Sequence, residues 1–182
     1  VSVVENSEHL PNAIDLAFSH SKTDTCVIEE RIMGTLHDAN GFFASDGIFY
    51  PLSVSDREWS NEISVEKGIV CPSLMSDIHE REFLKLFENA CRSLGIDKGP
   101  VKIDAMFDGK QFYVLEIAAR LHGPRNSLLG IPNTYGKHLL PVVINAMNNG
   151  QQPDWRFDEK MYVSYSEQIE TSKNGTIVDI VG

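Results

Sequence analysis

Residues 101–121 read VKIDAMFDGKQFYVLEIAARL, and this stretch decides the fold. Apolar and polar side chains alternate on both sides of Asp108-Gly109, a dipeptide that is typical of tight turns. Before the turn, the odd-numbered residues are apolar and the even-numbered ones include Asp104. After the turn, the even-numbered residues hold both charges, Glu116 and Arg120. We therefore predict an antiparallel hairpin with one apolar and one charged face.

The length of the turn decides whether the charged faces coincide, because a slip of one residue reverses the faces of a strand. A two-residue turn would pair Asp104 with Tyr113 and put Asp104 and Glu116 on opposite faces. A three-residue turn, residues 108–110, would pair Asp104 with Val114, place Glu116 across from Lys102 and unite the apolar faces. We predict the three-residue turn, which puts the two carboxylates on a diagonal of about 7–8 Å.

Carboxylates at this spacing suit a hard cation. One Mg²⁺, or two adjacent cations, could lie between Asp104 and Glu116. The alternative is a solvated face on which Lys102 and Glu116 form an ion pair, and the pattern alone leaves both interpretations open.

The composition argues against several classes of partner. The chain has 182 residues, 42% of them hydrophobic, and a formal net charge of −10. That charge repels nucleic acid, and no basic run offsets it. No apolar run approaches the roughly 20 residues of a membrane span, and no signal peptide opens the chain. Three cysteines without metal-ligand spacing fit buried thiols in a reducing compartment, so we expect a cytoplasmic protein.

The remaining segments are predicted from hydrophobic periodicity and turn residues. One helix follows Ser7, and a long helix begins after Ser76 and ends at Gly95. Residues 123–133 are predicted as a loop and residues 134–148 as a helix. Further strands are predicted in residues 25–32, 38–44, 47–54, 62–70, 161–170 and 176–181. Because the strands follow one another in hairpins, we predict an α+β fold, an antiparallel sheet with helices packed on one face.

The hairpin resembles a signature of the ATP-grasp superfamily. Residues 115–120, LEIAAR, are similar to its E-I-N-x-R motif, and Asp104 lies where the family has its other metal-binding carboxylate. Three further segments resemble the family's L-G-I-x-x-G-P lead-in, its adenine-pocket segment and its T-D-K element: residues 94–101, 27–34 and 55–57. Residues 175–182 are similar to strands of the branch with biotin carboxylase, carbamoyl-phosphate synthase and amino-acid ligases. The chain is thus identified as the C-terminal part of an ATP-grasp domain.

The resemblance implies an ATP-dependent carboxylate–amine ligase. Such enzymes use ATP and Mg²⁺, for which Mn²⁺ can substitute, to convert a carboxylate into an acylphosphate. An amine then attacks, which gives ADP and phosphate. The substrates implied are small acids and amines, above all amino acids, and a homodimer is the expected assembly.

The resemblance also implies roles for particular residues. Asp104 and Glu116 would bind the metal, and Arg120 would be the catalytic residue that holds the substrate carboxylate or acylphosphate. The residues implied in ATP binding are Glu29, Glu30, Ile32, His37, Arg57 and Met106. Of these, the backbone of Glu30 and Ile32 would bond adenine, Met106 would pack on its ring and Arg57 would reach the γ-phosphate.

Three departures from the family pattern bear on activity. Ala118 stands where the family has a metal-binding Asn. Leu36 replaces a ribose-binding Glu, for which His37 or Asp38 would substitute. The chain starts at Val1 without Met, and the phosphate-covering glycine-rich loop would lie upstream.

We therefore expect residues 1–150 to be the C-terminal portion of the ATP-grasp domain and residues 151–182 to begin a small β appendage. This piece alone is expected to be inert. Arg125, in the predicted loop, is either an anion contact or a solvated arginine. The alternative function is a catalytically inactive ATP-grasp-like module that binds nucleotide or a partner protein.

Overall fold

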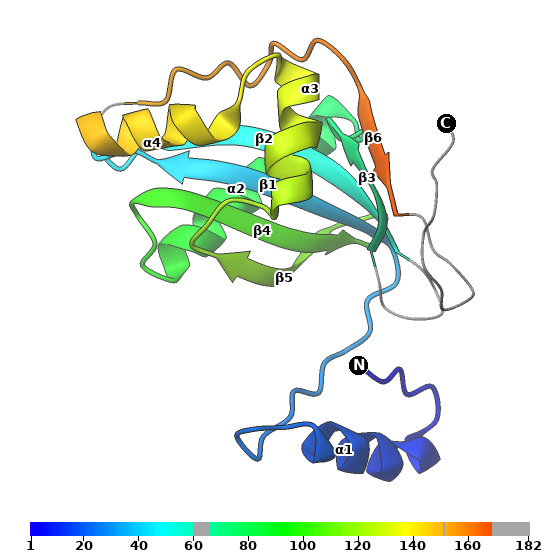
Figure 1. The fold of residues 1–182 in the computed structure, drawn as a ribbon. Coiled ribbons are helices and arrows are strands. Elements are labelled where there is room, and N and C mark those ends of the chain that lie inside the picture. The colour runs from blue at the N-terminus through cyan, green and yellow to red at the C-terminus, as the bar shows by residue number, and fades with distance from the viewer. Residues whose placement is uncertain (60–65, 151, 169–182) are drawn as a thin grey trace, which may run out of the picture.

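The computed structural model of the protein describes residues 1–59, 66–150 and 152–168. Within these residues, six strands form one sheet in the order β5-β4-β1-β2-β3-β6, and each neighbouring pair is antiparallel (Figure 1). The strands are β1 Thr35–Phe43, β2 Phe49–Trp59, β3 Glu66–Cys71, β4 Gly99–Phe107, β5 Phe112–Ala118 and β6 Ser164–Glu167. The predicted α+β class is confirmed.

The helices differ in how they relate to the sheet. They are α1 Leu10–Ser19, α2 Asp77–Ser93, α3 Ile131–Tyr135 and α4 Leu139–Asn149, with a 3₁₀ turn at Ser7–His9 and a π-helical turn at Asn126–Gly130. Figure 1 shows α1 and the segment that follows it lying apart from the sheet. None of the helices in the described ranges is long and apolar enough to cross a membrane.

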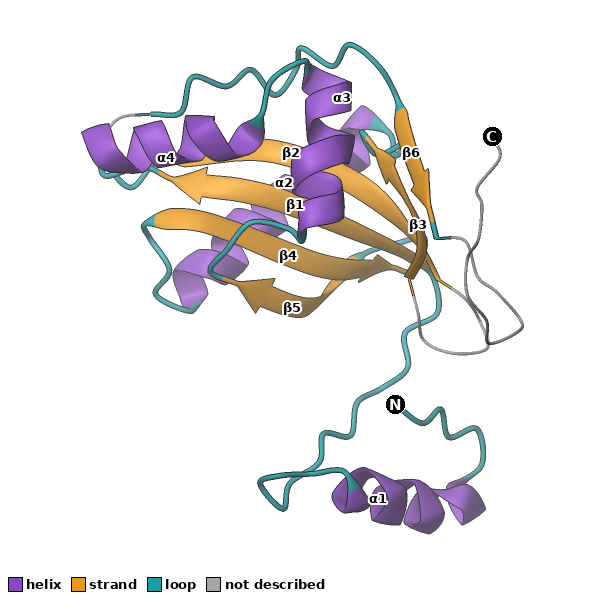
Figure 2. Cartoon of the chain, in the orientation of Figure 1, coloured by secondary structure: helices purple, strands orange, loops and turns teal. Residues whose placement is uncertain are grey.

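Helices cover both faces of the sheet, not one face as we predicted (Figure 2). Phe83 and Phe87 of α2 pack with Phe43 in one buried cluster. On the other face, Phe42 packs with residues of α3 and α4, among them Leu139. The reason is that β1 carries large apolar side chains at consecutive positions, and these point to opposite faces of a strand.

Most of the predicted elements are present. Ser76 caps α2 by accepting a hydrogen bond from the His79 amide at 3.3 Å, and Gly95 follows the helix with a φ of +74°. Strand β6 is shorter than predicted, and the strand predicted at 176–181 lies outside the described residues.

Two predicted elements are wrong. Residues 25–32 form no strand: Val27 and Ile28 are exposed, and no described strand pairs with this segment. The predicted loop 123–133 is largely helical, and the predicted helix 134–148 is divided because Gly136, with a φ of +67°, ends α3.

The β4–β5 turn is one residue longer than predicted. Phe107 pairs with Phe112, so the turn comprises residues 108–111. The Asp108 side chain closes this turn by accepting hydrogen bonds from the Lys110 and Gln111 amides, at 2.8 and 2.9 Å. These bonds also hold the pKa of the Asp108 carboxyl below its usual value.

A β-bulge in β5 then returns Glu116 to the face of the sheet that carries Asp104. The ladder shifts between Ala105 and Asp104, so that Leu115 is the extra residue and Glu116 pairs with Asp104. The predicted pairing of Asp104 with Val114 is therefore wrong. Directly opposed residues share a face, so the carboxylates meet across the ladder and not on a diagonal.

Candidate active site

Part of the sheet face that α3 and α4 cover is polar, although it is buried. On β1, Asp38 and Asn40 are separated by Ala39 and point to the side of α3 and α4. Asp38 pairs with Asp104 of β4 and with Ser55 of β2, and Asn40 pairs with Lys102. All five residues are buried. Since unpaired buried charges are costly, these groups must be neutralised by one another or by a ligand.

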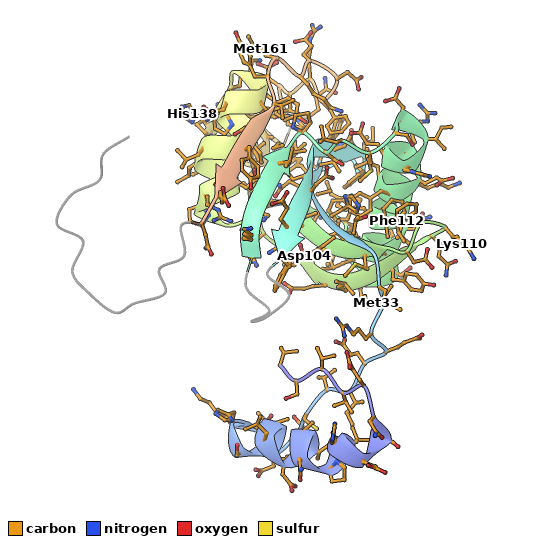
Figure 3. All side chains as sticks on the ribbon, turned by 90° about the vertical axis from the view of Figure 1, so that its right-hand side faces the viewer. Met33, Asp104, Lys110, Phe112, His138 and Met161 are labelled. Carbon is orange, nitrogen blue, oxygen red and sulfur yellow. The ribbon has the colours of Figure 1, made fainter. Side chains whose placement is uncertain are left out.

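Asp104, which Figure 3 labels on the sheet, lies at the centre of the hydrogen bonds of this polar face. One carboxylate oxygen accepts a bond from Lys102 Nζ at 2.5 Å and the other from Arg57 Nη1 at 2.9 Å. The Asp104 side chain is 12% exposed, whereas that of Glu116, on the edge strand β5, is 58% exposed. The nearest cation to Glu116 is Arg120, at 3.9 Å.

The pair Asp104 and Glu116 fits Mg²⁺ in the type and number of its donors. Mg²⁺ prefers carboxylate oxygens and is commonly held by one or two carboxylates together with substrate phosphates. In the described part of the chain, no cluster of three His, Cys, Asp or Glu side chains could hold a metal by itself. A cation at this position would need oxygen ligands from its substrate as well.

Arg57 joins the centre of the polar face to its edge. Besides Asp104, its guanidinium bonds Glu66 of β3, with Nε at 2.8 Å from the carboxylate. The same carboxylate also accepts a bond from Arg125 Nη2. Asp104, Arg57, Glu66 and Arg125 therefore form a continuous chain of alternating charges.

Asp38 is a buried carboxylate next to this chain. Its side chain is fully buried, and His122 Nε2 lies 2.9 Å from Oδ2, but in a direction unsuited to a hydrogen bond. Arg57 Nε lies 3.8 Å away. Neither oxygen accepts a hydrogen bond from a described residue. Asp38 thus lies within 4 Å of both the Arg57 guanidinium and the His122 ring on the polar face.

Two buried amides fix the segment after β5 to this face. The Asn40 carbonyl accepts a bond from the His122 amide at 2.7 Å, and Asn126 donates to Ser55 Oγ at 3.0 Å. Ser127 Oγ donates to the carbonyl of His122 at 2.8 Å. These bonds place residues 122–127 above β1 and β2, and they bring Arg125 to Glu66.

Comparisons with known proteins were made by sequence and by structure. The sequence matches no protein family profile and no curated protein. An L-amino acid ligase from Bacillus licheniformis is 20% identical with a TM-score of 0.77, over 95% of this chain and 43% of that one. A putative ATP-grasp superfamily protein from Archaeoglobus fulgidus is 20% identical with a TM-score of 0.55, over 81% and 43%. The chain has an ATP-grasp fold.

A third structure with this fold was solved with ligands. It is the biotin carboxylase domain dimer of Hydrogenobacter thermophilus 2-oxoglutarate carboxylase, in complex with MgADP, ADP and bicarbonate. It is 13% identical with a TM-score of 0.66, over 87% of this chain and 35% of that one. Our chain thus spans less than half of each of these proteins.

The ATP-grasp fold brings together several of the predicted site residues. Arg57, Asp104 and Glu116 lie on or beside the polar face, as described above. Met106 is half-buried on the Asp104 face and pairs with Leu36. Arg120 follows β5 directly, and its exposed guanidinium bonds the neighbouring Leu121 carbonyl at 2.9 Å.

Other predicted site residues lie elsewhere in the ATP-grasp fold. His37 points to the opposite face, where its ring lies near Phe83 and its Nδ1 donates to Asp56 at 2.8 Å. It cannot take the place of a ribose ligand beside Asp104, so this assignment is corrected. Glu29 and Glu30 are exposed and Ile32 is half-buried, all in the segment between α1 and β1.

The His37–Asp56 pair is the core of a second polar network, on the α2 side. Burial raises the pKa of Asp56, but hydrogen bonds from His37, the Leu74 amide and Ser73, together with the nearby imidazole, outweigh it. The pKa of Asp56 therefore lies below its usual value. This network ties β1 and β2 to the segment before α2.

Sequence reasoning missed four residues of the polar face. They are Asn40, Glu66 and Asn126, which received no role, and Lys102, which was assigned only to an ion pair with Glu116. A signal for Asn40 was present, because Asp38 and Asn40 are polar residues two apart in a strand that is otherwise largely apolar. Glu66 carried no such signal, because its partners are distant in sequence.

Proposed function

We propose that the protein carrying this chain is an ATP-dependent carboxylate–amine ligase that binds MgATP on the polar face. The observation that carries the proposal is the pairing of Asp104 with Glu116 on neighbouring strands, beside Arg57 and Lys102. The ligase and MgADP complex among the similar structures support it. We further propose that residues 1–150 belong to the ATP-grasp domain and that residues 151–182 begin a β appendage.

Each residue has a defined part in this proposal. Asp104 and Glu116 would hold Mg²⁺, or Mn²⁺, which when bound neutralises charge on the ATP phosphates. Lys102 and Arg57 would turn from Asp104 toward phosphate oxygens, and Met106 would pack against adenine. Arg120, whose side chain is more than half exposed, would bind the substrate carboxylate.

The proposed substrates are a small carboxylic acid and an amine, with an amino acid as one of the two. The backbone contacts of Glu30 and Ile32 with adenine stay a prediction, because their segment lies apart from the polar face. We also propose a cytoplasmic homodimer, since ATP is abundant in that compartment and one similar structure is a dimer.

Nucleotide binding by the whole protein tests the proposal. We expect Asp104→Asn and Glu116→Gln each to weaken Mg²⁺-dependent ADP binding at least tenfold in calorimetry, and neither to weaken metal-free ADP binding. Glu58→Gln is the matched control, because Glu58 is an acidic residue of β2 whose partner is Tyr165. Unchanged Mg²⁺-dependent binding in both variants would refute the metal assignment.

A second function is a module that binds nucleotide without chemistry. The observation in its favour is Ala118, which pairs with Lys102 and offers no side-chain oxygen for a second cation. ADP release from ATP, screened with all amino acids singly and in pairs, separates the two functions. Nucleotide binding without ADP release in any mixture would favour the binding module.

A further inference from the structure

Glu66 holds two guanidinium groups that come from distant parts of the chain. Its carboxylate accepts bonds from Arg57 of β2 and from Arg125, which lies just before the π-helical turn. The side chains of Arg57, Glu66 and Arg125 are 12%, 17% and 25% exposed, so the cluster lies at the rim of the polar face. Two guanidinium groups around one pair of oxygens are the arrangement that binds phosphate and carboxylate ligands.

We propose that Arg57 and Arg125 form a binding site for an oxyanion, and that Glu66 occupies this site until a substrate displaces it. The inference rests on the proposed function, because it takes the polar face to be where substrates bind. The ligand is an anionic group whose negative charge is shared by two or more oxygens, either a phosphoryl group or a substrate carboxylate. Glu66 is thus an internal competitor that sets the affinity for this group.

The geometry makes displacement of Glu66 feasible. Glu66 is the first residue of β3, so its side chain can turn toward solvent while the strand stays paired. Arg125 would stay in place, because its segment is anchored independently by Asn40 and by the bond from Asn126 to Ser55. Arg57, whose Nη1 bonds Asp104 in the structure, would give up that bond as it follows the incoming anion. The site could therefore exchange one anion for another without rebuilding the fold.

Replacement of Glu66 by an anion should also affect cation binding at Asp104, because Arg57 pairs with both carboxylates. In the structure, Lys102 and Arg57 neutralise Asp104, and Arg57 and Arg125 neutralise Glu66. An anion that draws Arg57 away frees an oxygen of Asp104 for a cation. Anion binding and cation binding should therefore strengthen each other, because both depend on the position of Arg57.

Removing the charge of Glu66 tests the inference directly. We expect Glu66→Gln to bind inorganic phosphate, or acetate, or both, at least fivefold more tightly than the unmodified protein in calorimetry at low salt. The gain should disappear in Glu66→Gln/Arg125→Gln. Glu58→Gln, which removes the same charge from the neighbouring strand, should show no gain.

The two ligands distinguish the source of the oxyanion. A gain with phosphate alone points to a phosphoryl group, and a gain with acetate alone to a substrate carboxylate. No gain with either ligand, or a gain that survives Arg125→Gln, overturns the inference. If Glu66→Gln does not fold, the Arg57 Nε–H signal of the unmodified protein provides the test. It should shift on titration with phosphate or acetate, and an unchanged signal with both overturns the inference.

This result is separable from the proposed function. Tighter phosphate binding by Glu66→Gln, without any MgATP binding by the protein, would support the oxyanion site and refute the ligase. Metal-dependent nucleotide binding that needs Asp104, without any gain from Glu66→Gln, would support the ligase and refute the displaced glutamate.

Discussion

Asp104 and Glu116 lie directly opposite each other on β4 and β5, yet only Asp104 is embedded in ion pairs. The Glu116 side chain is more than half exposed, and its ion-pair partner among the described residues is Arg120, at 3.9 Å. The two carboxylates share a proposed role in metal binding but differ in what they contribute to the fold. Mutation of the two residues should therefore affect the stability of the fold differently.

Stability should respond to Asp104 and not to Glu116. We expect Asp104→Asn to lower the free energy of unfolding by about 1–3 kcal/mol, because it leaves buried Lys102 without a charged partner and Arg57 with Glu66 alone. Glu116→Gln should change it by less than about 0.5 kcal/mol, as is usual for exposed positions. Urea denaturation at neutral pH measures both. Equal losses in the two variants would contradict the burial difference.

The Asp56 network predicts a pH dependence. Because the pKa of folded Asp56 lies below its usual value of 3.8, its stabilising effect is fully present above that pH. The effect is lost as the pH falls through the folded pKa. We expect Asp56→Asn to be less stable than the unmodified protein at pH 7, by about 1–3 kcal/mol, and this difference to shrink below pH 4. A difference that stays constant from pH 7 to pH 3 would refute the assignment.

The cysteines should differ in reactivity. Burial raises the pKa of Cys91 to about 11 and also raises that of Cys71, and both side chains are inaccessible. Cys26 is partly exposed. Since the thiolate is the reactive form, iodoacetamide at pH 8 should modify Cys26 alone in the folded chain and all three thiols in urea. Mass spectrometry of tryptic peptides reads this out, and early labelling of Cys91 would contradict it.

Gly34 is required by a close backbone approach. A Cβ at this position would lie 1.9 Å from the carbonyl oxygen of Phe107. We expect Gly34→Ala to lower the free energy of unfolding by about 1–3 kcal/mol, because the start of β1 must move away from β4. Gly123→Ala is the control, since a Cβ there meets no atom within 4 Å. If both variants unfold at the same urea concentration, β1 does not begin as described.

From the sequence, the shared face of Asp104 and Glu116 could be predicted, but the register of β4 and β5 could not. Strict alternation predicts one uninterrupted strand over residues 111–121, but the bulge at Leu115 reverses the faces midway. Phe112 therefore stacks on Phe83 of α2, although it was placed with the charged set. A bulge has no reliable sequence signal of its own, whereas the requirement that charges and apolar residues separate is strong. That requirement correctly placed Asp104 and Glu116 on one face, although the predicted pairing of Asp104 with Val114 was wrong.

The remaining errors have a common physical origin in contacts between distant segments. The helical turn at Asn126 depends on a buried hydrogen bond to Ser55, and His37 turns to the α2 side because residues of β1 alternate between two buried faces. Val27 and Ile28 have the composition of a strand, but no described strand lies beside them. Local pattern could not decide these cases, since each outcome is set by a partner far along the chain.

The bulge at Leu115 divides β5 into two units that can change independently during evolution. Residues 112–114 before it include Phe112, which packs against α2, while Glu116 and Ala118 after it face the polar side. Substitutions at Phe112 should be limited by folding, and substitutions at Glu116 by the chemistry of the polar face. A single-residue insertion or deletion next to Leu115 would couple the two again, because it decides which face Glu116 occupies.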